Sequence, residues 1–447
     1  LSKLFESQRQ QLLSARPLVP LGIRQDLEHV RSQNWQAAPT PQDLLCRHVE
    51  ITGPGNDAKM VINALNSQAD GYMFDLEDSM SPTVANVRDA HQNIRRIVDG
   101  TLAFETPAKS YRLNDQRQPT FHVRTRGLHL PHHDGGSAML YDIAKFLEGS
   151  AHQMIDAGKQ PYLYIPKLES YEEAVFVNTV LEECEDYLGL QSGTVKTTVL
   201  IETFPAIFQT DEIIYALNNR IVGLNCGRWD YLFSMMKSLP EHVFEDRAEL
   251  TMCKPFMEAY VRQIVSTCHR RNIHAMGGMS AFIPSKGDMT EVLQKIADDK
   301  ILEISRGCDG AWVAHPGLIE PVKALFEEHI GANQKRVQQS LPHVNDFYPF
   351  KEPLEAADPT PAVAVASEYI SQWLDGNGAV ALNGLMEDMA TAEISLSQVR
   401  NWVNNGVVDD LDLSDVQPRI RHIIEQYIEQ DADFIPDVAG EALKHDN

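Results

Sequence analysis

Acidic residues and an arginine directly follow short apolar runs of this 447-residue chain, in positions suited to chemistry. Glu202 follows the run TTVLI, and Asp230 comes soon after the run IVGLNC. Arg124 closes the run TFHV, whereas Asp388 lies far downstream, in a segment of helical character. This arrangement predicts a site with a metal and an arginine at one end of a barrel. A carboxylate from a second domain would close it.

Glu202 and Asp230 lie 28 residues apart, which is the length of one strand-plus-helix unit. They would therefore emerge from neighbouring strands, close enough to share a hard cation. Two carboxylates with positions left for substrate and water are typical of Mg²⁺.

A magnesium ion beside an arginine suits carbonyl chemistry. The metal polarises a carbonyl oxygen as a Lewis acid, and the arginine stabilises an enolate oxygen as charge develops. Such chemistry also needs a base that removes a proton from carbon. A carboxylate from another domain, held away from the metal, fits that need.

Other polar residues also stand at the ends of the expected strands. They are Asp75, Glu77 and Asp78 after the second strand, Arg126 after the third, Lys167 and Glu169 after the fourth, and Arg228 after the sixth. Strand ends often face water, so an ordinary solvated charge is an alternative interpretation of each. However, acids follow the buried runs of the second, fifth and sixth strands alike. This shared pattern favours a common site over separate solvated charges.

Eight short apolar runs alternate with amphipathic stretches and predict eight β/α units. The runs begin at His48, Gly71, Thr120, Pro161, Thr197, Ile221, Ile273 and Gly310. They are rich in β-branched and aromatic residues and lack strict alternation, which is typical of strands buried on both faces. The predicted fold class is therefore α/β, a (β/α)8 TIM barrel.

The chain divides into four predicted segments. Residues 1–44 form an N-terminal helical arm, 45–337 the barrel, and 338–363 a proline-containing linker. Residues 364–447 form an all-helical domain. Within it, Ser395 and Gln398 have the spacing of a capping box, which predicts a helix start at Ser395.

Composition excludes several classes of protein. The net charge of −24 argues against nucleic-acid binding, which requires a basic face. No apolar run reaches eighteen residues, so we expect no membrane span. The cysteines are widely spaced without a CxxC motif, which favours reduced thiols in a cytoplasmic setting over disulfides or a zinc site. They are Cys46, Cys184, Cys226, Cys253, Cys268 and Cys308. The oligomeric state is left open.

Long stretches of the chain resemble malate synthases of the shorter, A-type isoform. The most specific are FDLEDSMSPTVANV, HVRTRGLHL, TTVLIETFPAIFQTDEIIYALNNRIVGLNCGRWDYLFS, AMGGMSAFIPSK, DGAWVAHPGL and NGLMEDMATAEIS. The resemblance implies a β8/α8 barrel with a C-terminal helical plug. It also implies the condensation of acetyl-CoA with glyoxylate and the hydrolysis of malyl-CoA to malate and CoA.

The resemblance also implies roles for individual residues. Glu202 and Asp230 correspond to the Mg²⁺ ligands, Arg124 to the catalytic arginine, and Asp388 to the general base. The remaining correspondences are Gly227, Arg228 and Trp229 in the loop whose backbone amides hold the glyoxylate carboxylate, Glu77 supporting the metal, and Pro316 beside the CoA adenine.

Two other functions remain open. A malyl-CoA or citramalyl-CoA lyase would share the Glu/Asp pair and the arginine, but it would release no free CoA in the condensing direction. A non-catalytic barrel that binds CoA or an organic acid would show binding without turnover. The same enzyme type works in the bacterial cytosol and in glyoxysomes, so a cytoplasmic location is expected and a glyoxysomal one is not excluded.

Overall fold

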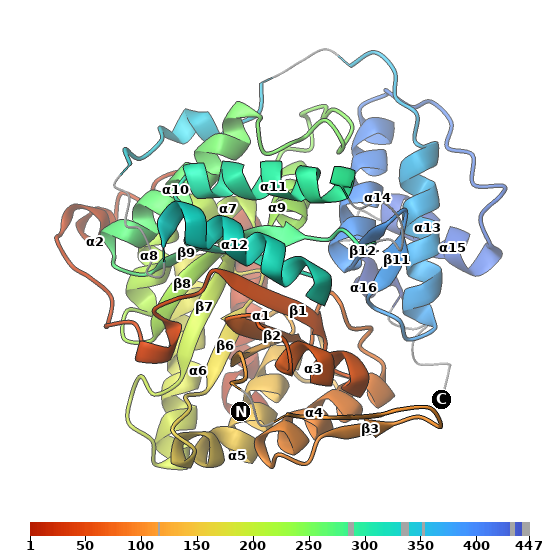
Figure 1. The fold of residues 1–447 in the computed structure, drawn as a ribbon. Coiled ribbons are helices and arrows are strands. Elements are labelled where there is room, and N and C mark those ends of the chain that lie inside the picture. The colour runs from red at the N-terminus through yellow and green to blue at the C-terminus, as the bar shows by residue number, and fades with distance from the viewer. Residues whose placement is uncertain (115–116, 285–289, 332–338, 351–353, 430–433, 440–447) are drawn as a thin grey trace.

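The computed structural model describes residues 1–114, 117–284, 290–331, 339–350, 354–429 and 434–439. Its centre is a closed barrel of parallel strands in the order β1-β10-β9-β8-β7-β6-β5-β2 (Figure 1). The strands are β1 Val49–Pro54, β2 Gly71–Asp75, β5 Thr120–Arg124, β6 Tyr162–Ile165, β7 Lys196–Ile201, β8 Ile221–Cys226, β9 His274–Ser280 and β10 Gly310–Val313. Each overlaps one of the eight predicted runs, so the TIM-barrel prediction is confirmed.

Alternating residues of these strands point into and out of the barrel. Inside, Met73, Tyr164, Leu200 and Trp312 form a small apolar cluster of their own. Outward residues such as Val199 and Ile201 join the main core beneath the helices. Both faces of each strand are therefore buried, which explains the absence of strict alternation in the sequence.

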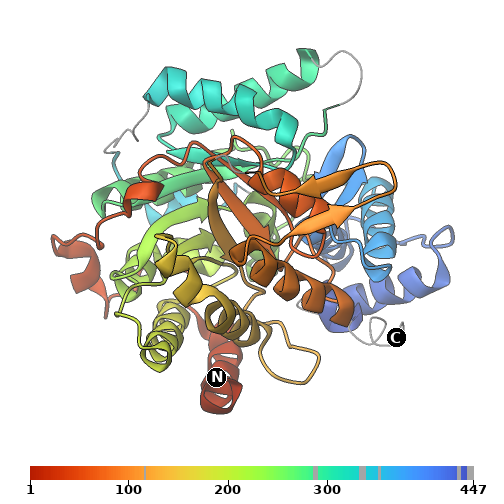
Figure 2. The ribbon, with the colours of Figure 1, turned by 60° about the horizontal axis from the view of Figure 1, so that its bottom comes forward.

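Helices surround the barrel, as Figures 1 and 2 show from two directions. They are α3 Ala58–Leu65, α4 Val84–Val98, α5 Ala138–Asp156, α6 Tyr171–Leu188, α7 Phe204–Ile207, α8 Thr210–Ala216, α9 Arg228–Ser238, α10 Pro255–Arg270, α11 Thr290–Ser305 and α12 Ile319–Ile330. A hairpin of β3 (Ala103–Glu105) and β4 (Ser110–Arg112) extends from the loop between α4 and β5.

The N-terminal segment is fastened to the barrel by arginines. It contains α1 (Ser2–Ala15) and α2 (Glu28–Ser32). Arg9 Nε donates to the carbonyl of Leu128 at 2.6 Å, and Arg16 Nε pairs with Glu173 Oε1 at 2.7 Å.

The C-terminal region has a hydrophobic core separate from that of the barrel, built around Tyr369, Trp373 and Ile424. Its elements are α13 Thr360–Leu374, β11 Val380–Leu382, β12 Leu385–Glu387, α14 Met389–Asn404, α15 Pro418–Glu429 and α16 Ile435–Ala439. The region lies against one side of the barrel (Figure 1). The domain boundaries drawn from the sequence stay a prediction.

Two sequence predictions in this region need correction. The region is helical but not all-helical, because β11 and β12 form an antiparallel hairpin. Asn383 and Gly384 turn it, with φ of 49° and 80°, as a two-residue hairpin loop requires. Helix α14 begins at Met389 rather than at Ser395. Ser395 lies inside the helix, where its hydroxyl donates to the Thr391 carbonyl at 2.6 Å instead of capping.

Candidate active site

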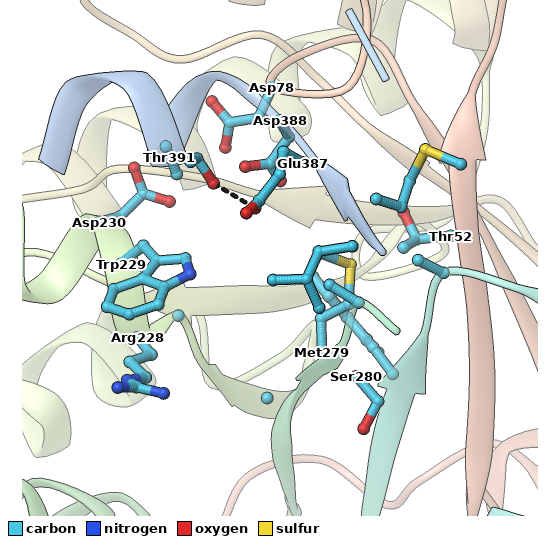
Figure 3. Close-up of a pocket in the computed structure, with 18 of the residues that line it drawn as sticks. Thr52, Asp78, Arg228, Trp229, Asp230, Met279, Ser280, Glu387, Asp388 and Thr391 are labelled. Carbon is cyan, nitrogen blue, oxygen red and sulfur yellow. Dashed lines mark hydrogen bonds between the residues drawn. The ribbon is translucent and has the colours of Figure 1, made fainter. Parts of the chain in front are cut away.

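A cavity of about 660 Å³ lies between the C-terminal ends of the barrel strands and the C-terminal region. Arg124, Glu202 and Asp230 line it from the barrel, and Asp388 lines it from the C-terminal region. Figure 3 shows Asp78, Asp230 and Asp388 gathered at one side of the pocket, with Trp229 and Arg228 below them. The structure thus brings together the four residues on which the sequence prediction depended.

Arg124 ends β5 and is held by carboxylates from the neighbouring strand. Its Nε and Nη2 donate to the two oxygens of Asp75 at 2.6 and 2.7 Å, a bidentate pair. Its Nη1 donates to Asp78 Oδ2 at 3.2 Å. The register of β2 and β5, which places Asp75 opposite Arg124, explains this pairing. Asp75 and Asp78 therefore fix the direction of the guanidinium.

Lys167 is a second buried cation that the sequence placed at a strand end without a role. Its Nζ lies 2.8 and 2.9 Å from the oxygens of Asp78 and 3.1 Å from Asp230 Oδ1. Burial alone would lower its pKa, but Asp230 and Asp78 outweigh that effect and hold the pKa well above its usual value. Its φ of 52° is unusual for a residue with a side chain. This backbone conformation accompanies a hydrogen bond from its N–H to Glu202 Oε1 at 2.9 Å.

Glu202 follows β7 and Asp230 lies in the first turn of α9, so the two come from adjacent β/α units. Gly227 lies between them in space. A Cβ on Gly227 would stand 2.7 Å from both Cβ and Oε2 of Glu202, so only glycine permits this close approach.

The carboxyl groups here repel one another in a buried setting. Burial, followed by the charge of Asp230, raises the pKa of Glu202 well above its usual range. Burial also raises the pKa of Asp230. For Glu77, burial and the charge of Asp78 raise the pKa to about 8. A bound cation would relieve this repulsion.

Unpartnered oxygens mark where a cation fits. Both carboxyl oxygens of Glu77 are buried without a hydrogen-bond partner among the described residues, and Asp230 Oδ1 is buried with an ion-pair contact of 3.1 Å to Lys167 Nζ. Glu77 Oε2 has longer ion-pair contacts, 3.4 Å to Lys167 Nζ and 3.7 Å to Arg124 Nη1. An all-oxygen donor set of this kind suits a hard divalent ion.

The N-terminus of α9 opens into the same cavity. The Gly227 N–H is engaged, since it donates to the Tyr260 hydroxyl at 2.9 Å. No side chain caps the helix, and Arg228 and Trp229 line the cavity at its first turn. The Arg228 guanidinium stacks over the Trp229 ring at 4.1 Å and donates to the Leu250 carbonyl at 2.9 Å. Free amides and a helix dipole at this position favour an anion such as a carboxylate.

Asp388 reaches the cavity because β11 and β12 are tied to the barrel. The Met386 N–H donates to the Ala281 carbonyl at 2.7 Å, and the Ile283 N–H donates to the Gly384 carbonyl at 2.9 Å. Asp388 itself occupies the N-cap position of α14, yet its side chain makes no capping hydrogen bond. Burial, followed by the charges of Asp78 and Asp230, raises its pKa well above the usual range.

Asp78 joins the two halves of the site. Its carboxylate pairs with Arg124 and Lys167, while its backbone carbonyl accepts from the Met389 N–H at 3.1 Å and the Tyr369 hydroxyl at 3.2 Å. Tyr369 also donates to the Gly378 carbonyl at 2.7 Å.

Some predicted or strand-end residues lie elsewhere. Arg126 pairs with Asp142 at 2.7 Å, and Glu169 pairs with Arg16 of the N-terminal segment at 3.1 Å. Pro316 begins a 3-10 turn, Pro316–Leu318, and is not among the residues that line the cavity. These strand-end charges therefore fasten the scaffold, while the role expected of Pro316 stays a prediction.

Sequence analysis missed Glu393, one turn along α14 from Asp388. It is buried, and its Oε2 has no hydrogen-bond partner among the described residues. Burial raises its pKa well above the usual range, and Lys167 partly opposes that shift. Its position in the motif MEDMATAE, on the same helix as Asp388, is the signal that could have identified it.

Comparison with known proteins assigns both parts of this assembly. The family model "Malate synthase, TIM barrel domain" matches residues 120–347, and "Malate synthase, C-terminal" matches 356–445. The chain belongs to the malate synthase family. The reaction of malate synthases is an acyl transfer that condenses acetyl-CoA with glyoxylate, and the family uses a divalent metal.

Individual malate synthases match most of the chain. A malate synthase of Myxococcus xanthus is 45% identical over 84% of this chain and 72% of its own length. Malate synthase A of Escherichia coli is 39% identical over 98% of this chain and 86% of its own length. A glyoxysomal malate synthase of Candida tropicalis is 40% identical, with coverage of 91% and 79%.

A solved structure supports the fold. A Haloferax volcanii malate synthase, described as a ternary complex with pyruvate and acetyl-CoA, aligns with a TM-score of 0.54 at 14% identity. The alignment covers 91% of this chain and all of the other. Among the described residues, no helix has the length and apolarity needed to cross a membrane.

Proposed function

We propose that Glu202 and Asp230 hold Mg²⁺ and that Arg124 and Asp388 carry out the proton and charge chemistry of the condensation. The observation that carries this proposal is the meeting of all four residues at one cavity, although Asp388 comes from a separate region with its own core. The acid-rich donor set and the Glu77 carboxyl oxygens, which lack a hydrogen-bond partner among the described residues, support a hard divalent ion at this position.

Asp388 acts on the methyl group of acetyl-CoA. Its side chain is not used as a helix cap, and its raised pKa makes it a stronger base than an exposed aspartate. It removes one methyl proton, and the electron pair left behind forms the enolate. Asp388 belongs to the C-terminal region, whereas the proposed metal ligands belong to the barrel.

Arg124 stabilises the enolate oxygen as negative charge develops. Asp75 holds two of its nitrogens, so the guanidinium need not reorganise during the reaction. The first turn of α9, at Arg228 and Trp229, orients glyoxylate by its carboxylate. Mg²⁺ bound by Glu202 and Asp230 would polarise the aldehyde as a Lewis acid.

The enolate carbon then attacks the aldehyde carbon and forms malyl-CoA. Water hydrolyses the thioester and gives malate and free CoA. No covalent enzyme intermediate is needed, so none of the cysteines serves as a nucleophile. Cytoplasmic or glyoxysomal placement stays a prediction, since the relatives include bacterial enzymes and others named glyoxysomal.

The test is the release of free thiol from acetyl-CoA in the presence of glyoxylate, with and without Mg²⁺ after chelation. We expect thiol release that requires both glyoxylate and Mg²⁺. Consumption of glyoxylate into a stable CoA ester without thiol release would instead indicate a lyase. Binding of acetyl-CoA without any turnover would indicate a non-catalytic protein.

A further inference from the structure

A cluster of three different metal-ligating side chains lies at the N-terminal end of the barrel strands. Cys46 and His48 precede and adjoin β1, and Asp70 directly precedes β2. Donor atoms of these three residues all lie within 4.8 Å of one another. The C-terminal ends of the same two strands face the active site, roughly 20 Å away along β1. This cluster is therefore separate from the proposed Mg²⁺ site.

His48 is the most informative member. Its side chain is fully buried, and neither ring nitrogen has a hydrogen-bond partner among the described residues. Buried polar atoms are normally paired, so two unpaired nitrogens on one ring point to a ligand. The ring stacks on Phe326 with centroids 5.8 Å apart, which holds its orientation. Burial lowers the pKa of His48, which favours the neutral imidazole that metals bind.

Asp70 is held in place by the backbone. Its Oδ2 accepts from the N–H groups of His48 and Val49 at 3.1 and 3.2 Å. Its Oδ1 pairs with Lys323 Nζ at 2.8 Å. Lys323 also reaches the Gln68 carbonyl at 3.2 Å, and its side chain is 19% exposed. The lysine therefore has an alternative acceptor and access to solvent if a cation takes its place at Oδ1.

Cys46 completes the set from the solvent side. It is partly exposed, and its thiol is free. Burial, followed by the charge of Asp70, raises the pKa of this thiol, so it carries a proton before any metal binds. Binding of a divalent cation releases that proton. The resulting thiolate and the Asp70 carboxylate then balance the two positive charges.

We propose that Cys46, His48 and Asp70 form a binding site for Zn²⁺, with water as the fourth ligand. One sulfur, one imidazole nitrogen and one carboxylate oxygen are the donor types that Zn²⁺ accepts in tetrahedral sites. Mg²⁺ prefers oxygen donors, so it should bind at Glu202 and Asp230 rather than at this site. The bound ion links the residues that precede β1 and β2 at the N-terminal end of the barrel.

Cobalt(II) is a suitable probe, because a thiolate bound to Co²⁺ gives an intense near-ultraviolet charge-transfer band. The full-length protein, kept in excess Mg²⁺, is titrated first with Co²⁺ and then with Zn²⁺. We expect one Co²⁺ per chain with this band, and its loss when Zn²⁺ displaces Co²⁺. Cys46→Ser should abolish the band and weaken Zn²⁺ binding about tenfold or more.

Matched variants test whether the thiolate band arises at this site. Cys253→Ser removes an exposed cysteine and should leave the band unchanged. Glu202→Gln alters the proposed Mg²⁺ site and should also leave it unchanged. His48→Asn should weaken binding like Cys46→Ser, and its circular dichroism spectrum shows whether it remains folded. The proposal is overturned if no thiolate band appears, or if Cys46→Ser retains the affinity of the unaltered protein for Zn²⁺.

Discussion

The two sides of the active site are built in different ways. On the barrel side, Arg124 is fixed by a bidentate pair to Asp75, and Glu202 accepts from a backbone N–H. On the other side, Asp388 stands at the start of a helix whose region has its own core. The helix is buried from Met389 to Trp402 and is also tied to the loop after α9, where Gln398, Asn401 and Trp402 donate to backbone carbonyls. The barrel thus supplies groups whose side chains are fixed by hydrogen bonds and ion pairs, and the C-terminal region supplies a proposed base whose side chain makes no capping hydrogen bond.

The largest effect should come from Asp388→Asn, which removes the proposed base and keeps the size of the side chain. General-base catalysis contributes typically 10²- to 10⁴-fold, so we expect kcat to fall by about that factor. The measurement is steady-state thiol release, combined with Mg²⁺ binding, which should not change. Asp375→Asn, at an exposed aspartate of the same region, is the matched control and should retain activity. Near-normal turnover of Asp388→Asn would contradict this division of roles.

Arg124→Lys should have the next largest effect. Lysine keeps the charge but cannot make the bidentate pair with Asp75, so the cation loses its fixed direction. We expect kcat to fall by about 10²-fold, by analogy with the loss of one oxyanion donor. Arg88→Lys, at an exposed arginine that does not line the cavity, is the matched control for this exchange of cations. If Arg124→Lys were as active as the unaltered protein, a point charge would be sufficient.

Glu202→Gln should act on the metal rather than on the base. The substitution removes one of the two proposed carboxylate ligands, so the Mg²⁺ concentration for half-maximal activity should rise about tenfold or more. Saturating Mg²⁺ should restore part of the activity, which would not happen for Asp388→Asn. Unchanged Mg²⁺ dependence would remove Glu202 from the metal site.

The pH dependence should reveal how the barrel tunes the base. Asp388 must be ionised to accept a proton, and burial together with Asp78 raises its pKa. The value of kcat/KM should therefore be full above this raised pKa and decrease as pH falls through it. Asp78→Asn removes one cause of the shift, so its acidic limb should lie at lower pH. A limb that stays in place in Asp78→Asn would show that Asp78 does not influence the base.

Tyr369→Phe should have the smallest effect. The hydroxyl shares its one proton between the Gly378 carbonyl at 2.7 Å and the Asp78 carbonyl at 3.2 Å, so its removal weakens the contact between the two regions. Loss of such a hydrogen bond costs about 1 kcal/mol of unfolding free energy. We expect kcat to fall less than about tenfold. Tyr187→Phe, at a tyrosine that is 81% exposed, is the control and should change neither quantity.

The barrel could be predicted well from the sequence because its strands are apolar runs with polar ends. Glu202 and Asp230 were recognisable for the same reason, since both lie just beyond such runs. The hairpin before Asp388 was missed although Asn383 and Gly384 form a common turn signal. Its strands are only three residues long, and Leu385 of β12 bridges to Phe282, which lies 103 positions earlier, a contact that no local pattern reveals.

Lys167 shows a second limit of sequence-based reasoning. Its role depends on Asp78 and Asp230, which lie 89 and 63 positions away in the chain, and on a left-handed backbone conformation. Neither is encoded by neighbouring residues. The close approach of Gly227 to Glu202 likewise depends on tertiary structure, because the two residues belong to different loops.

Asp78 has a consequence for inhibition. Its carboxylate holds Arg124, and its carbonyl holds the start of the helix that carries Asp388. A compound that displaces Asp388 from the cavity should therefore also shift Asp78, and with it the side chain of Arg124. Two inhibitors, one bound beside Asp388 and one bound beside Arg228 and Trp229, should not bind independently. The affinity of each should depend on the presence of the other by the same factor.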